Sequence, residues 1–150
     1  PDAWKPMYRL ELLSVPAITF TPAEGNDFEM YLSGYWGIER SSVSADEVVA
    51  MARKRMAKWG DRSSTKLSLQ EIRSEKVTMA YFDATDSYYH PQDPGEYPFL
   101  KQGCAMIEGY VFSFTILYGE NGRDDAQVGI DAIANAQFLD HGDVPTLTLP

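Results

Sequence analysis

The dipeptide Glu108-Gly109 constrains the fold more than any other feature of the sequence, because it separates two runs with the composition of β-strands. These runs are Lys101 to Ile107 and Tyr110 to Tyr118. A two-residue loop that ends in glycine favours the positive φ angles of a tight hairpin turn. The sequence therefore predicts a β-hairpin at this point in the chain.

The turn also predicts which residues face each other across the hairpin. Counting outward from it places Ala105 opposite Phe112 and Gly103 opposite Phe114, so small residues face large ones. The opposite face, which carries Cys104, is less apolar than this one but more apolar than a solvent-exposed surface. Both faces of the hairpin therefore need cover.

Alternating apolar and polar residues predict further strands elsewhere in the chain. Pro16 limits pairing next to the second of them, which is expected at the edge of the sheet. The predicted strands are Met7 to Leu13, Ala17 to Phe20, Phe28 to Glu39, Lys66 to Ser74 and Lys76 to Thr85.

Two segments have the apolar spacing of helices. Ser44 and Glu47 form a capping-box pattern that predicts a helix from Ser44 to Trp59. Asp124 is expected to cap a second, alanine-rich helix that ends at Leu139. Each helix has one apolar side suited to packing on a sheet.

The order of these elements predicts one α+β domain over residues 1–140, followed by a C-terminal tail over residues 141–150. We expect an antiparallel sheet covered by helices on both faces, as a three-layer sandwich. The alternative is a cone-shaped fold of the nuclear-transport-factor type, whose curved sheet would enclose a pocket lined by Tyr35, Trp36, Tyr81 and His90.

Composition excludes several classes of function. The 150-residue chain carries 13 basic and 22 acidic side chains, and its formal net charge of -9 disfavours nucleic acid as a ligand. No apolar run approaches the length of about 20 residues that a membrane helix needs, so membrane insertion is not expected. The single cysteine, Cys104, is expected to be buried and structural.

Recognised catalytic motifs are not found in the sequence, and neither a catalytic residue nor a cofactor is expected. His90 with Asp93 and Glu96, and His141 between two aspartates, have donor atoms for a metal ion but no defined ligand spacing. A dyad of Cys104 with His90 would need contacts that the sequence does not predict. No metal site is therefore predicted.

The segment from Phe99 to Leu139 resembles the C-terminal half of PsbP-like and Mog-like proteins. It has an apolar strand, the Glu108-Gly109 turn, an aromatic strand and an alanine-rich helix that ends in Ala136-Gln137-Phe138. The resemblance implies an α/β/α sandwich and a non-enzymatic binding or assembly factor, exported in many bacterial members. The start at Pro1 without methionine fits a mature exported protein or a trimmed chain, so we expect a periplasmic or secreted location, with a cytoplasmic one as the alternative.

We expect a binding or accessory domain that contacts a protein partner, with a small enzyme or ligand carrier as the alternative. The predicted contact surface is the loop from Asp86 to Pro98, in which prolines lower the entropy cost of ordering. An acidic rim around the loop is expected from Asp86, Asp93 and Glu96. The aromatic rings of this loop either pack on the sheet or are exposed and contact a partner. The candidate binding residues are Tyr88, Tyr89, His90, Asp93, Glu96 and Tyr97.

Overall fold

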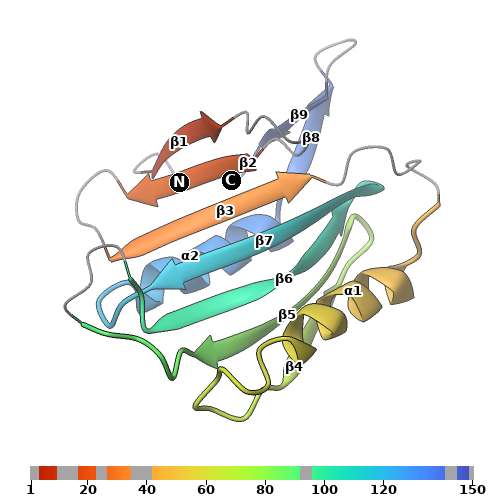
Figure 1. The fold of residues 1–150 in the computed structure, drawn as a ribbon. Coiled ribbons are helices and arrows are strands. Elements are labelled where there is room, and N and C mark those ends of the chain that lie inside the picture. Colours follow the sequence, from red (N-terminus) through yellow and green to blue (C-terminus); the bar gives the residue numbers. More distant parts are fainter. Residues whose placement is uncertain are drawn as a thin grey trace.

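The computed structural model describes residues 4–9, 17–22, 27–34, 42–91, 96–140 and 145–148. Within them, antiparallel strands form one seven-stranded sheet with the order β1-β2-β3-β7-β6-β5-β4 (Figure 1). This confirms an α+β fold with an antiparallel sheet. The strands are β1 (Trp4–Arg9), β2 (Ala17–Pro22), β3 (Phe28–Gly34), β4 (Leu69–Arg73), β5 (Val77–Thr85), β6 (Phe99–Ile107) and β7 (Tyr110–Tyr118).

The predicted hairpin is confirmed as the pair β6 and β7. Both turn residues have positive φ angles, 48° at Glu108 and 87° at Gly109, as a tight two-residue turn requires. The register matches the prediction, with Gly103 opposite Phe114. A β-carbon on Gly103 would lie 2.2 Å from the carbonyl oxygen of Ala80 on β5, so only glycine fits here.

The first helix, α1 (Ala45–Ala57), begins at the predicted capping box. The Ser44 hydroxyl accepts the Glu47 amide at 3.3 Å, and the Glu47 carboxylate accepts the Ser44 amide at 2.7 Å. The buried face of α1 packs against side chains of even-numbered residues in β5 and β6, among them Ala80 and Cys104. The predicted burial of Cys104 is confirmed, since its exposed fraction is 0%.

The second helix, α2 (Arg123–Ala134), begins and ends differently from the prediction. Asp124 lies in its first turn, so its prediction as the cap is wrong, and Gly122 occupies the cap position. The turn before α2 is held by Asp27, whose carboxylate accepts the Asn121 amide at 2.8 Å. At the other end, the Asn135 side chain donates to the carbonyl of Asp131 at 2.8 Å, which ends the helix before Leu139.

The largest buried cluster lies beneath α2. Its helix residues, which include Ile130 and Ile133, pack with Met79 of β5, Ala105 of β6 and Phe114 of β7. Adjacent residues in a strand point to opposite faces of a sheet. Along β5 and β6, the residues that contact α2 therefore alternate with the residues that contact α1.

The ends of the chain differ in part from the sequence prediction. The first strand begins at Trp4 rather than Met7, and the predicted extension of β3 beyond Gly34 lies outside the described residues. Where a tail was predicted, β9 (Pro145–Thr148) pairs with β8 (Gln137–Asp140) in a separate two-stranded sheet. Strands of four residues are stabilised mainly by pairing with a neighbouring strand, so their own sequence gives little signal.

Candidate functional site

The loop between β5 and β6 is fixed at its start by Asp86. The Arg62 Nε atom donates to both carboxylate oxygens at 3.1 Å, and Arg62 Nη2 donates to Oδ2 at 2.5 Å. The same carboxylate accepts the Tyr88 amide at 2.9 Å. Because Arg62 donates these hydrogen bonds, it holds the pKa of Asp86 below its usual range.

Backbone contacts join the same turn to the segment that follows α1. The amide and hydroxyl of Ser87 donate to the carbonyl of Arg62 at 2.9 and 2.6 Å. The Asp86 amide donates to the carbonyl of Pro98 at 2.9 Å, which closes the base of the loop. The Arg62 guanidinium also lies 4.7 Å from the centre of the Trp59 ring. The turn is therefore held by several independent contacts.

The candidate binding residues of this loop differ in exposure. The Tyr88 ring is exposed, at 65%, while Tyr89 is half-buried. His90 and Glu96 are both exposed, and the His90 amide donates to the Glu96 carboxylate at 3.4 Å. Asp93 lies outside the described residues. Of the three candidate tyrosines, Tyr88 is thus the one whose ring faces solvent.

Tyr97 lies at the opposite end of the loop and is half-buried. Burial raises its pKa to about 12, and the charges of Glu29 and Asp27 add to this shift. The sequence left open whether the loop tyrosines pack inward or wait for a partner. Tyr97 packs inward, whereas Tyr88 points outward.

Asp86 does not serve as the acidic rim that the sequence predicted. Its side chain is only 11% exposed and is paired with Arg62. Within the described part of the loop, the carboxylate of Glu96 remains exposed. The rim prediction failed for Asp86 because Arg62, 24 positions earlier, could not be assigned to it from the sequence.

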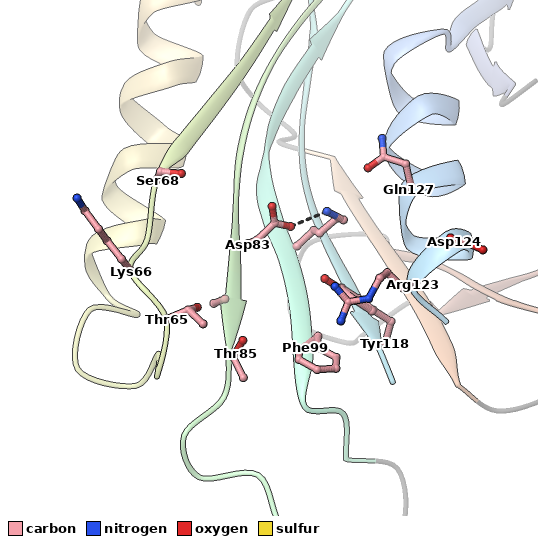
Figure 2. A pocket seen from close by; sticks show the side chains of 12 residues that line it. Thr65, Lys66, Ser68, Asp83, Thr85, Phe99, Tyr118, Arg123, Asp124 and Gln127 are labelled. Atoms are coloured by element: carbon pink, nitrogen blue, oxygen red, sulfur yellow. Dashed lines mark hydrogen bonds and ion pairs between the residues drawn. The ribbon is translucent and has the colours of Figure 1, made fainter. Parts of the chain in front are cut away.

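An open cavity of about 600 Å³ lies at the same end of the sheet. Thr85 and Phe99, which flank the β5–β6 loop, both line it (Figure 2). The other walls come from the segment before β4, from strands β5, β6 and β7, and from the first two turns of α2. The remaining lining residues are Thr65, Lys66, Ser68, Asp83, Ala84, Lys101, Tyr118, Arg123, Asp124 and Gln127.

Two cationic side chains enter this cavity from different elements. Lys101 of β6 donates to Asp83 Oδ1 at 2.6 Å, and Gln70 donates to Asp83 Oδ2 at 2.7 Å. The Arg123 guanidinium lies 5.2 Å from the centre of the Phe99 ring. Figure 2 shows Arg123 close to Phe99 and Tyr118, and Asp83 on the sheet wall of the cavity.

Sequence reasoning did not find this cavity. The pocket predicted for the cone alternative included Tyr81 and His90, neither of which lines it, and also Tyr35 and Trp36, which lie outside the described residues. The lining residues come from five separate segments and have no shared spacing. The alternation of Asp83 with Thr85 on one face of β5 was the only local signal.

Among the described residues, the possible metal site at His90 and the thiol dyad gain no support, and His141 lies outside these residues. Among the residues that the structure describes, no group of three or more His, Cys, Asp or Glu side chains could hold a metal ion. Cys104 lies within a fully buried cluster, whereas His90 is exposed in a loop. No described helix is long and apolar enough to cross a membrane.

Comparisons with protein-family models, with curated proteins and with solved structures find no significant match to this chain. The resemblance to PsbP-like and Mog-like proteins therefore stays a prediction. The candidate site is therefore defined by the geometry of its residues alone.

Proposed function

We propose that this chain is a non-enzymatic binding domain that holds a protein partner through the turn around Tyr88. The observation that carries the proposal is the 65% exposure of the Tyr88 ring on a turn fixed by Arg62 and Asp86. Exposed tyrosines are frequent energetic centres of protein interfaces, because their rings supply a large contact area with few rotatable bonds.

The contacts that fix the turn support this role. A binding loop that is already ordered loses less conformational entropy when its partner binds. Asp86 anchors the turn to Arg62 by its side chain and to Pro98 by its backbone. The backbone at Tyr88 is therefore already ordered in the folded protein before a partner binds.

The charge around the turn suggests the chemistry of the partner. Glu96 is exposed beside His90, and the whole chain carries a formal net charge of -9. A field of this sign accelerates the approach of a basic surface. The partner is therefore proposed to present Lys or Arg side chains around an apolar contact for Tyr88.

The three-layer form of the fold is proposed with this function. It is supported by the alternating contacts, since α1 packs on Ala80 and Cys104 while α2 packs on Met79 and Ala105. The PsbP-like or Mog-like resemblance and an exported location belong to the same proposal. They would make the chain an accessory factor that works by contact rather than by catalysis.

The test begins with affinity capture from the source cell and identification of the main partner by mass spectrometry. The purified partner is then titrated against wild-type protein and Tyr88→Ala by biolayer interferometry. We expect Tyr88→Ala to weaken binding at least tenfold, which is about 1.4 kcal/mol. The thermal unfolding midpoint should stay unchanged, because the ring is exposed.

Val128→Ala is the matched control, since Val128 on α2 is also an exposed large apolar residue, at 42%. It should bind the partner as the wild type does. Equal binding by wild type and Tyr88→Ala would overturn the proposal. Equal weakening by Tyr88→Ala and Val128→Ala would also overturn it, because the loss would then not be specific to the turn.

The alternative function, a small-ligand carrier, is favoured by one observation, the cavity of about 600 Å³ between α2 and the sheet. Cavities of this size hold small organic molecules in many proteins.

A further inference from the structure

The geometry points to a second binding site, separate from the Tyr88 turn: the cavity beside α2 takes a small organic carboxylate with an aromatic or other planar apolar body. The cavity joins a cationic group, an aromatic wall and hydroxyl groups within about 600 Å³. Each of these features contributes a separate part of the recognition.

The first feature is the arginine of the cavity. The Arg123 guanidinium lies over the Phe99 ring at 5.2 Å, a contact that limits its freedom while leaving the edge of its plane able to donate. A guanidinium edge suits the two oxygens of a carboxylate. Its intramolecular partner, Glu120 at 3.4 Å, is a weak competitor because both side chains are more than 60% exposed.

The second feature is the balance of charge inside the cavity. Both oxygens of Asp83 already accept hydrogen bonds, one from Lys101 at 2.6 Å and one from Gln70 at 2.7 Å. Figure 2 shows the side chains of Lys66 and Asp124 directed away from the cavity. Among the lining residues, the inward charges are then Lys101, Arg123 and Asp83, an excess of one cation. Glu120, the partner of Arg123, does not line the cavity. This local excess differs in sign from the charge of the whole chain.

The third feature is the aromatic wall. Phe99 and Tyr118 pack at 5.5 Å between ring centres with a 30° angle between their planes. Phe99, which is half-buried, offers an apolar surface next to the Arg123 guanidinium, and Tyr118, only 5% exposed, packs behind it. A ligand with a planar apolar body can cover this surface while its charged end contacts Arg123.

The hydroxyl groups of Thr65, Ser68 and Thr85 line the opposite side of the cavity. They can donate to or accept from polar substituents on the body of the ligand. An excess of only one cation fits a monoanion better than a dianion, because Asp83 would repel the second negative charge. A carboxylate is therefore favoured over a phosphate ester.

The test uses benzoate as the probe and benzamide as its neutral counterpart of nearly the same shape. Each is titrated into the uniformly ¹⁵N-labelled full chain, and amide chemical shifts are followed by NMR. We expect benzoate to shift the amides of Thr85, Phe99 and Arg123, with a dissociation constant on the order of 1 mM for so small a ligand. Benzamide should bind at least fivefold more weakly.

Arg123→Gln should weaken benzoate binding at least fivefold and remain folded, because the Arg123 side chain is 61% exposed. The matched control is Arg73→Gln, since Arg73 is also an exposed arginine paired with acidic side chains but does not line the cavity. Arg73→Gln should bind benzoate as the wild type does.

Several results would overturn the inference: equal binding of benzoate and benzamide, tighter binding of inorganic phosphate, absent shifts at the cavity, or unchanged benzoate binding by Arg123→Gln. The two proposals can be overturned independently of each other. Tyr88→Ala should keep benzoate binding, and Arg123→Gln should keep partner binding. A Tyr88→Ala variant that lost benzoate binding would show that the two surfaces form one site.

Discussion

The Cζ atom of Phe114 lies 2.9 Å from the point that a β-carbon on Gly103 would occupy. The same β-carbon would lie 2.7 Å from Cβ of Tyr81, so strands β5, β6 and β7 meet at this point without space for a methyl group. The small residue on β6 is thus matched to the large ring on β7 and to its neighbour on β5. This match keeps the sheet closely packed beneath α2.

We predict that Gly103→Ala lowers the free energy of unfolding by about 1–3 kcal/mol, because backbone atoms of β5 must move to admit the methyl group. Urea denaturation measures the change. Gly60→Ala is the control, since its β-carbon would lie 3.5 Å from the nearest atom, an ordinary contact. Equal stability of Gly103→Ala and Gly60→Ala would contradict the packing described here.

A second prediction concerns acid stability. Arg62 lowers the pKa of Asp86 in the folded protein. The stabilisation is therefore present above the ordinary aspartate pKa of about 3.9 and is lost as the pH falls through the lower, folded value. Arg62→Gln should reduce the free energy of unfolding by about 1–2 kcal/mol at pH 7. The difference from wild type should shrink towards pH 2 when urea denaturation is repeated there.

Asp86→Asn provides the complementary variant, because it removes the titrating group and keeps an oxygen that can accept from Arg62. Its stability should vary less with pH than that of the wild type between pH 5 and pH 2. A constant difference between wild type and Arg62→Gln over this range would contradict the assignment.

A third prediction concerns Tyr97, whose pKa of about 12 arises mainly from burial. Because the folded pKa is raised, the associated stabilisation is complete below the ordinary tyrosine pKa of about 10 and is lost as the pH rises through 12. NMR of tyrosine labelled with ¹³C at Cζ should show one resonance that titrates near 12 and is missing in Tyr97→Phe. Titration of that resonance near 10 would mean that the ring is solvated.

A fourth prediction concerns Cys104, which packs among Val48, Val49 and Ala52 of α1. Maleimide labelling of the native protein should be slow and should become fast in denaturing urea. Cys104→Ser should cost about 1–3 kcal/mol, because it places a hydroxyl group in an apolar cluster. Cys104→Ala should retain more stability than Cys104→Ser. Rapid labelling under native conditions would show that the thiol is accessible.

The elements that the sequence predicted well are those whose signals are local. The turn at Glu108-Gly109 and the capping box at Ser44 each depend on residues within a few positions. The cap of α2 was assigned to the wrong residue because its turn is held by Asp27, far away in the chain. Local patterns carry no information about such a partner.

The candidate site was predicted in part for the same reason. The loop of aromatic residues was evident from composition, but the exposure of Tyr88 and the packing of Tyr97 depend on the surrounding fold. The pairing of Asp86 with Arg62 joins two segments 24 positions apart. The cavity was not predicted because its charged residues, such as Lys101 and Arg123, come from different elements.

The hydrogen bond between Asp27 and Asn121 spans 94 positions of the chain, and it sets the place where α2 begins. Arg123 is the first residue of that helix, so the wall of the cavity is completed only when β3 has docked beside β7. Contacts between residues so far apart form late in folding, because a long loop must close first. The β6–β7 hairpin, whose contacts are local, can therefore form before the wall of the cavity is complete.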